Sequence, residues 1–277
     1  MTFTWKSLDP PPDFTTGTAG FVRAALRGVL LLVILSSGLA LTAVIRLVEQ
    51  PLYKLHRPWT PYITQWVCRM AFVVLGMRHE IEGTPMTHAG AVVANHASWL
   101  DIFALNARKR VYFVSKSEVA SWPGIGLLAR ITGTVFINRD PKQARAQTEI
   151  FENRLMAGHR LLFFPEGSST DGMRILPFKS TLFQAFFSDN ICHDIYVQPV
   201  TVIYRAPPDQ DPRFYGWWGD MTFAAHALKV LAASPHNSVK IVYHRPVKVD
   251  EFDNRKVLSA YVEEVVRSAM PKDRQSR

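Results

Sequence analysis

The longest apolar run in the chain covers residues 28–45, GVLLLVILSSGLALTAVI, which are 18 positions without a charged side chain. About 20 apolar residues form a helix that crosses the hydrocarbon layer of a membrane. The run therefore predicts an N-terminal hydrophobic membrane-anchoring helix, either as a full span or as a monotopic anchor. A cleaved signal peptide is the alternative, which the late start and the lack of a small-residue cleavage site disfavour.

A second apolar segment, ITQWVCRMAFVVLGM at residues 63–77, is interrupted by Arg69 and contains Trp66. This pattern fits an interfacial amphipathic helix, and it fits equally a core helix of the domain that follows. We therefore divide the chain into a loosely ordered, Pro- and Gly-rich segment at 1–27, the membrane anchor and interfacial helix at 28–80, and a globular domain at 81–277.

Beyond residue 80, short apolar runs alternate with helical patterns. The runs are rich in β-branched and aromatic residues and predict strands at residues 91–95, 110–115, 134–138, 160–165, 195–204 and 239–244. Helices are predicted at residues 141–157, with Asp140 and Pro141 at their start, and at 254–270. The alternation predicts an α/β fold with a mixed, largely parallel sheet flanked by helices.

The charge of the chain narrows the choice of partners. With 32 Lys and Arg against 23 Asp and Glu, the formal net charge is +9, which favours an anionic partner. The apolar anchor points to an anionic membrane surface, and no basic run interleaved with aromatic residues supports nucleic-acid binding. Cys68 and Cys192 lie far apart and outside metal-ligand spacing, so the sequence indicates neither a disulfide framework nor a zinc site.

The first polar cluster that follows a predicted strand is VVANHASWLD, residues 92–101. If a helix begins at Ser98, His96 stays in the loop and Asp101 lies in the first turn, where its carboxylate can orient the imidazole as a general base. Ser98 and Asp101 also form a capping box, and under that interpretation His96 is only a polar loop residue. The segment alone leaves both interpretations open.

Two further clusters follow predicted strands, at the edge where ligands bind in open α/β sheets. In GTVFINRD, Arg139 offers a cation for an anionic headgroup, or it is a surface arginine paired with an acidic neighbour. In LLFFPEGSSTDG, Glu166 and Gly167 form a tight turn after Pro165. The carboxylate can accept hydrogen bonds from substrate hydroxyls while nearby amides face an oxyanion, or the segment is an ordinary solvated turn.

Four segments, NHASWLD, GTVFINR, FFPEGSS and VQPVTVIY, resemble in order and spacing the four motifs of the glycerolipid acyltransferase family, which includes the lysophosphatidate acyltransferases. The resemblance implies a glycerol-3-phosphate acyltransferase-like fold. It implies that His96, oriented by Asp101, activates an acceptor hydroxyl for direct attack on the thioester of acyl carrier protein or coenzyme A, without an acyl-enzyme, metal or other cofactor. It places in the substrate site Asn95, Arg139, Glu166, Gly167, Ser168 and Lys179.

One departure from the family pattern concerns the acceptor. Members that act on lysophosphatidate usually carry an arginine where this chain has Ser168-Ser169, and loss of that cation weakens recognition of a phosphate. The strings FPEGSSTDGMRILPFKSTLF and YGWWGDM resemble the branch that acylates lyso-ornithine lipid. We expect that acceptor on the cytoplasmic face of a bacterial inner membrane. The alternatives are lysophosphatidate, bound through Arg139, Arg174 or Lys179, and, from other classes, a lipid hydrolase or a non-enzymatic lipid-binding protein.

Overall fold

The computed structural model describes residues 5–7, 10–11, 14–137 and 144–275. Within them the chain forms an eight-stranded sheet in the order β1-β7-β6-β2-β5-β3-β4, with β8 paired to β6. The strands are β1 (Arg78–Glu82), β2 (Gly90–Ala94), β3 (Tyr112–Lys116), β4 (Val135–Ile137), β5 (Arg160–Phe163), β6 (Tyr196–Arg205), β7 (Ser238–Tyr243) and β8 (Val247–Lys248).

The sheet is mixed and mostly parallel, as predicted. β2 pairs in parallel with β5 and with β6, while β7 and β8 run antiparallel to β6. All five residues of β2 are buried, which explains its continuous apolar sequence, because a central parallel strand is covered on both faces.

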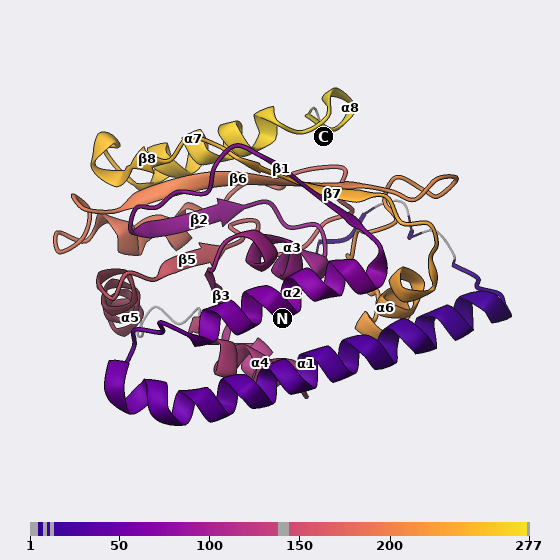
Figure 1. Cartoon of the computed structure of the whole chain (residues 1–277). Coiled ribbons are helices and arrows are strands. Elements are labelled where there is room, and N and C mark those ends of the chain that lie inside the picture. Colours follow the sequence, from indigo (N-terminus) through magenta and orange to yellow (C-terminus); the bar gives the residue numbers. More distant parts are fainter. Residues whose placement is uncertain (1–4, 8–9, 12–13, 138–143, 276–277) are drawn as a thin grey trace.

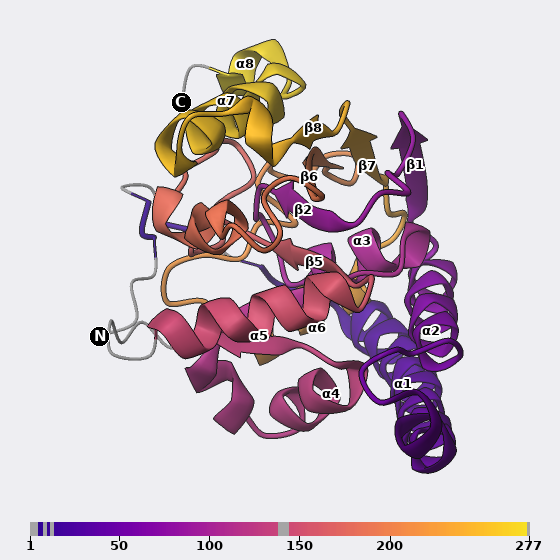
Figure 2. The ribbon, with the colours of Figure 1, turned by 90° about the vertical axis from the view of Figure 1, so that its left-hand side faces the viewer.

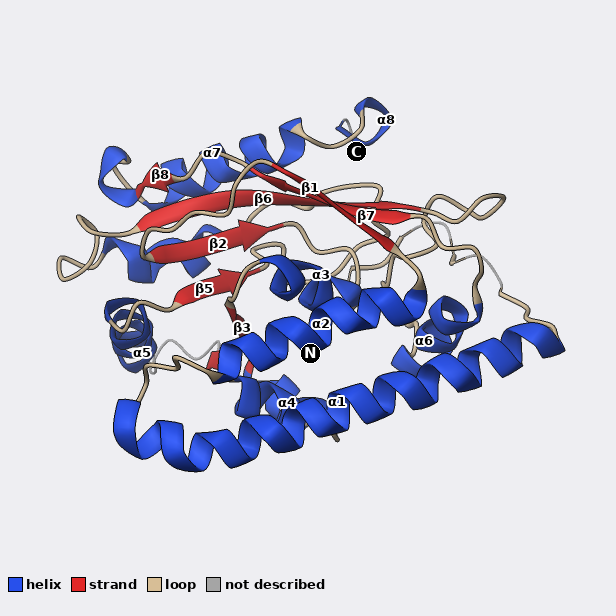
Figure 3. Ribbon diagram, in the orientation of Figure 1, coloured by secondary structure: helices blue, strands red, loops and turns tan. Residues whose placement is uncertain are grey.

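Helices cover the two faces of the sheet (Figures 1 and 3). On one face lies α7 (Arg255–Ser268), whose Leu258, Val262 and Val266 pack in a core with the 3-10 helix Ser180–Phe187 and with α5 (Ala144–Met156). The other face carries a second core and the remaining long helices, with α1 outermost. These are α1 (Thr18–Tyr53), α2 (Thr60–Leu75), α3 (Leu100–Arg108), α4 (Ile125–Thr132) and α6 (Phe223–Ala232).

The anchor helix is longer than the sequence predicted. α1 begins at Thr18 instead of near residue 28, so part of the segment expected to be loosely ordered is helical. The reason is tertiary contact: Arg23 donates to the Ala232 carbonyl at 2.6 Å, and Arg27 donates to the carbonyls of Leu231 at 2.9 Å and Ala233 at 2.6 Å. Among the described residues, α1 is the one helix long and apolar enough to cross a membrane.

The second apolar segment forms α2, and its two faces differ. Cys68, Phe72 and Leu75 are buried in the core, whereas Trp66 is 51% exposed. α2 lies beside α1 (Figure 2) and also contacts α3. The predicted division at residue 80 falls inside β1, so α2 and β1 are part of the α/β domain and not of a separate anchor segment.

Candidate active site

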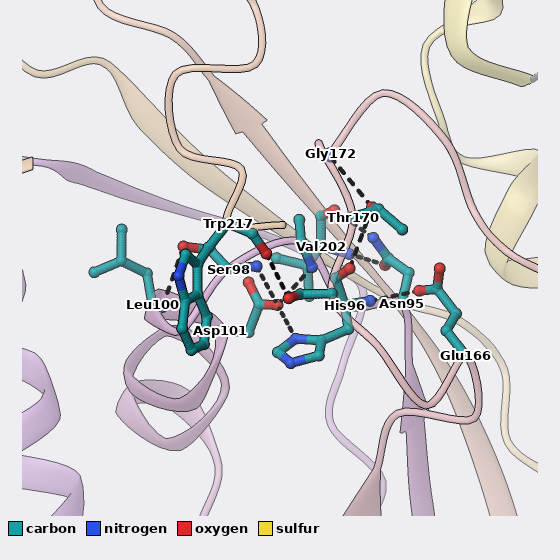
Figure 4. A network of polar contacts seen from close by, with 12 residues as sticks. Asn95, His96, Ser98, Leu100, Asp101, Glu166, Thr170, Gly172, Val202 and Trp217 are labelled. Atoms are coloured by element: carbon teal, nitrogen blue, oxygen red, sulfur yellow. Dashed lines mark hydrogen bonds and ion pairs between the residues drawn. The ribbon is translucent and has the colours of Figure 1, made fainter. Parts of the chain in front are cut away.

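The polar clusters of the sequence meet at one edge of the sheet. β2 lies between β5 and β6 and is parallel to both, so the loops after these strands leave from the same edge. His96 follows β2 and Glu166 follows β5 (Figure 4). Tyr204 lies near the end of β6.

His96 and Asp101 form a direct pair. The His96 Nδ1 atom lies 2.7 Å from Asp101 Oδ2, and the same oxygen accepts hydrogen bonds from the backbone N–H groups of Ala97 at 2.8 Å and Ser98 at 3.0 Å. The second oxygen, Oδ1, accepts a hydrogen bond from the Tyr204 hydroxyl at 2.7 Å. Four donors therefore converge on one buried carboxylate, which holds Nδ1 as the protonated ring nitrogen and leaves Nε2 as the proton acceptor.

The two interpretations of the VVANHASWLD segment are compatible. Asp101 accepts the Ser98 N–H as a capping residue does, and it binds the imidazole with the same oxygen. The helix begins at Leu100 instead of Ser98, preceded by a turn in which the Asp101 N–H donates to the Ser98 carbonyl at 3.1 Å. The turn before the helix thus brings the carboxylate to the histidine, while the N-cap position itself is Trp99, without a side-chain cap.

Hydrogen bonds with Glu166 and Thr170, in the loop after β5, hold the backbone of His96 in place. Its N–H donates to Glu166 Oε1 at 2.6 Å, and its carbonyl accepts from the Thr170 N–H at 3.0 Å. The imidazole stacks on the Phe164 ring, with centroids 4.1 Å apart and an interplanar angle of 11°. The ring therefore has one defined orientation before any substrate binds.

The Glu166 side chain is buried and binds backbone N–H groups on both sides of this loop. Its second oxygen accepts the Leu176 N–H at 2.7 Å, and the residue is 1% exposed. Burial raises the pKa of Glu166 to about 8, although the two backbone donors act in the opposite direction. Both carboxylate oxygens of Glu166 thus accept backbone N–H groups, one of them from His96, and its contact with substrate hydroxyls stays a prediction.

Asn95 has a comparable internal role. Its Nδ2 donates to the Val202 carbonyl at 3.0 Å and its Oδ1 accepts the Val202 N–H at 2.7 Å, so the side chain continues the pairing of β2 with β6. Asn95 is 2% exposed. Both polar atoms of its side chain are thus bound within the protein, and its place in the substrate site stays a prediction.

His96 opens onto a cavity of about 1090 Å³. Three other predicted site residues line it: Gly167, Ser168 and Lys179. Its wall is largely apolar where it is formed by Val114, Ile137, Phe151, Phe163, Phe164, Leu182 and Ala185. A largely apolar cavity lined in part by a histidine suits a substrate with a hydrocarbon chain and a reacting polar head.

Of the cations considered for phosphate binding, one is described with a carboxylate partner and one is not described. Arg139 lies outside the described residues. Arg174 pairs with Asp171, with Nε to Oδ1 at 3.3 Å and Nη2 to Oδ2 at 3.0 Å, and its guanidinium lies 4.8 Å from the centroid of the Trp5 ring. Arg174 is also not among the residues that line the cavity.

Among the residues that the structure describes, no group of three His, Cys, Asp or Glu side chains is placed to hold a metal ion.

Comparison with known proteins decides the family. The family model described as Acyltransferase matches residues 78–203. The chain is 54% identical over 266 residues to a lyso-ornithine lipid O-acyltransferase from Rhodobacter capsulatus, and the match covers 96% of each chain. The chain belongs to the acyltransferase family.

Two other relatives extend this result. A 1-acyl-sn-glycerol-3-phosphate acyltransferase from Neisseria gonorrhoeae is 43% identical to this acyltransferase over 99 residues, 34% of this chain and 37% of that one. The crystal structure of the 1-acyl-sn-glycerophosphate acyltransferase from Thermotoga maritima matches with a TM-score of 0.55 at 22% identity, over 87% of this chain and 94% of that chain. The predicted fold and the predicted acyltransferase family are thereby confirmed.

Some residues at the site of this acyltransferase were not predicted. Tyr204 is the last residue of the VQPVTVIY motif, from which the sequence predicted no side chain for the site, and it donates to Asp101. Burial raises the pKa of its hydroxyl well above its usual value, so the hydroxyl stays a donor. Lys116, Trp217 and Trp218 line the cavity. The position of Lys116 at the end of β3 was the one signal that pointed to it, since that is where the other clusters lie.

Proposed function

We propose that this acyltransferase transfers a fatty acyl chain from a thioester to the free hydroxyl of lyso-ornithine lipid. The observation that carries the proposal is the 54% identity to a protein of that activity across 96% of both chains. The alternative acceptor, 1-acyl-sn-glycerol-3-phosphate, has support from a shorter match, 43% identity over 99 residues.

The composition of the loop after β5 supports an acceptor without a phosphate. Ser168 and Ser169 stand where a phosphate-binding arginine is expected, and both line the cavity. The next arginine along the chain, Arg174, is paired with Asp171. An arginine already bound to a carboxylate is a poor partner for a phosphate dianion, because the existing ion pair must first be broken.

The geometry supports general-base catalysis. Asp101 orients the imidazole through Nδ1, so the Nε2 atom of His96 takes the proton of the acceptor hydroxyl as the oxygen attacks the thioester carbonyl. The tetrahedral intermediate then collapses, the C–S bond breaks, and the imidazolium returns the proton to the leaving thiolate. We assign stabilisation of the oxyanion to N–H groups of the Ser168-Ser169 turn, which lines the same cavity.

The mode of membrane attachment follows from α1. At about 1.5 Å per residue its 36 residues are about 54 Å long, well over the roughly 30 Å of the hydrocarbon layer. α1 contacts α2, α4 and α6 instead of projecting from the domain. This packing supports a monotopic helix lying along the membrane. We place the protein on the cytoplasmic face because acyl carrier protein and coenzyme A thioesters would supply the acyl group there.

The test is an acyl-transfer assay with labelled acyl carrier protein or acyl-CoA and a panel of purified lysolipids. We expect lyso-ornithine lipid to be the best acceptor. Equal or faster transfer to lysophosphatidate would overturn the acceptor assignment. Release of free fatty acid at the same rate with and without an acceptor would identify a hydrolase instead.

A further inference from the structure

A second pocket lies at the opposite edge of the sheet from His96. It has a volume of about 320 Å³, equivalent to about ten water molecules at about 30 Å³ each, which is room for a phosphate ester group. The pocket is formed by the connection between α1 and α2, the start of β3, and the turn between α5 and β5. The residues that line it are His56, Arg57, Pro58, Pro61, Tyr62, Arg110, Tyr112, Ala157, Gly158, His159 and Arg160.

The lining of this pocket is cationic. Arg57, Arg110 and Arg160 all contribute to it, and no Asp or Glu is among its described lining residues. Burial lowers the pKa of Arg57, and one carboxylate outside the lining, Glu49, acts to raise it by a smaller amount. Burial lowers the pKa of Arg160, and the neighbouring Arg110 lowers it further. Burial also lowers the pKa of Lys109, with further lowering by Arg160 and Arg110. Several partly buried cations that repel one another are stabilised by an anion placed between them.

Existing contacts hold these cations in place. The Arg110 guanidinium lies 4.0 Å from the centroid of the Tyr62 ring, and an Arg57 Nη1 donates to the Ile131 carbonyl at 2.8 Å. Arg160 donates through Nη2 to the Thr87 carbonyl, while its Nε is buried without a partner among the described residues. The pocket therefore has fixed donors with unused hydrogen-bonding capacity.

His159 adds an acceptor to this set of donors. It is 3% exposed, and its Nε2 lies 2.9 Å from the Leu55 carbonyl, so Nε2 is the protonated nitrogen. Burial lowers the pKa of His159 to about 3, so the ring is neutral and Nδ1 is a hydrogen-bond acceptor. Nδ1 has no partner among the described residues. A hydroxyl close to a bound phosphate would satisfy it.

The surroundings of the pocket identify the source of the anion. Beside it, the end of α1 and the start of α2 expose large apolar and aromatic side chains, which are Leu52, Tyr53, Leu55, Trp59 and Tyr62, each between 41% and 65% exposed. The Tyr53 and Trp59 rings pack edge to face with centroids 5.3 Å apart. Trp and Tyr beside Arg and Lys are typical of the headgroup level of a membrane.

We infer that this pocket binds the phosphate of an anionic glycerophospholipid and fixes the α1–α2 end of the protein at the membrane surface. The site is separate from the active site: Gln147 of α5 lines the catalytic cavity, whereas Ala157 just beyond α5 lines the cationic pocket, about 15 Å away along the helix axis. The inference rests on the proposed function only for membrane attachment, and not for the reaction or its acceptor.

The test compares two double variants of the full chain in a vesicle co-flotation assay. Arg110→Gln with Arg160→Gln removes two charges from the pocket. Arg245→Gln with Lys256→Gln removes two exposed charges outside it, the second of them on α7, across the sheet from α1. The vesicles contain phosphatidylcholine alone or phosphatidylcholine with phosphatidylglycerol, and neither acyl donor nor acceptor is present, so the result is independent of acyl transfer.

We expect the pocket variant to bind phosphatidylglycerol vesicles about 25-fold more weakly, about fivefold per charge, with unchanged binding to neutral vesicles. The control variant should lose less than twofold, and both variants should keep the thermal unfolding midpoint of the wild type. Equal losses in the two variants, or none in the pocket variant, would overturn the inference. Two other results would also overturn it. In the first, glycerol 3-phosphate raises the thermal unfolding midpoint of the wild type alone, but the pocket variant binds vesicles as well as the wild type does. In the second, the pocket variant has a raised KM for acyl carrier protein and no loss of vesicle binding.

Discussion

At the residue scale, Asp101 is the centre of the site, because its two oxygens receive four hydrogen bonds from His96, Ala97, Ser98 and Tyr204. Asp101→Asn keeps the shape but removes the charge that stabilises the imidazolium. We expect the variant to fold and its kcat to fall by about 10² to 10⁴, the range typical of a general acid–base contribution. Initial rates at saturating acceptor, with circular dichroism to check folding, measure this effect.

Tyr204→Phe is the matched control, since it removes one donor to Asp101 and leaves the carboxylate charge. Its kcat should fall much less than that of Asp101→Asn. A variant at position 101 that retains kcat within threefold of the wild type would contradict the role of the carboxylate.

The raised pKa of Glu166 predicts how the stability of the folded protein changes with pH. With a folded-state pKa of about 8 against an ordinary value of 4.5, the folded protein binds more protons than the unfolded chain between these values. The stability of the wild type therefore falls as pH rises from about 4.5 to about 8. Glu166→Gln removes this dependence, and its amide NH₂ cannot accept one of the two backbone N–H groups. The variant should be less stable by about 1–3 kcal/mol near pH 5, with a smaller difference near pH 8.

Chemical denaturation in detergent micelles at pH 5, 6.5 and 8 measures that difference. A gap between wild type and Glu166→Gln that stays constant or widens as the pH rises would contradict the raised pKa.

Single residues also show which contacts the sequence could predict and which it could not. His96 and Asp101 were predictable because their spacing and the helix start together determine their contact. Asn95 and Glu166 were placed near the site, but their side chains turn inward and bind the backbone of Val202 and of Leu176. Position after a strand does not reveal on which side of the loop a polar side chain finds its partner.

At the element scale, the predicted strands correspond to β2 through β7, because apolar β-branched runs are what buried strands require. β1, with the sequence RHEIE, was missed since it lies at the edge of the sheet and keeps polar, partly exposed side chains. β8 has two residues, too few for a periodic signal. The N-terminal extension of α1 depends on contacts with α6, more than 200 residues away in sequence.

Those contacts lead to a prediction. Arg27 donates to two carbonyls beyond the last intrahelical bonds of α6, so Arg27→Ala leaves them without this partner. We expect a loss of about 1.5–3 kcal/mol in the free energy of unfolding, and faster hydrogen exchange in α6.

Leu26→Ala is the control, because Leu26 is the preceding residue of α1 and is 64% exposed. It should change the free energy of unfolding by less than about 0.5 kcal/mol. Equal effects of the two substitutions would contradict the docking of α1 through Arg27.

At the scale of the whole molecule, the surfaces that we propose for membrane attachment and for the chemistry occupy different parts of one fold. α1 exposes many apolar side chains, among them Leu26, Leu32, Val44 and Leu47, each between 62% and 75% exposed. The catalytic cavity is built from loops at the carboxyl edge of the sheet, and the cationic pocket lies at the other edge. The sequence predicted the anchor and the catalytic loops, but the cationic pocket is assembled from three segments that no local pattern connects.

The central claim is that His96 is the general base of acyl transfer to a lysolipid. The most direct measurement is the rate at which labelled acyl groups pass from acyl carrier protein to lyso-ornithine lipid with wild type and with His96→Ala, both shown to be folded. The account predicts a loss of at least about 10² in the variant. Transfer by His96→Ala at the wild-type rate would contradict it.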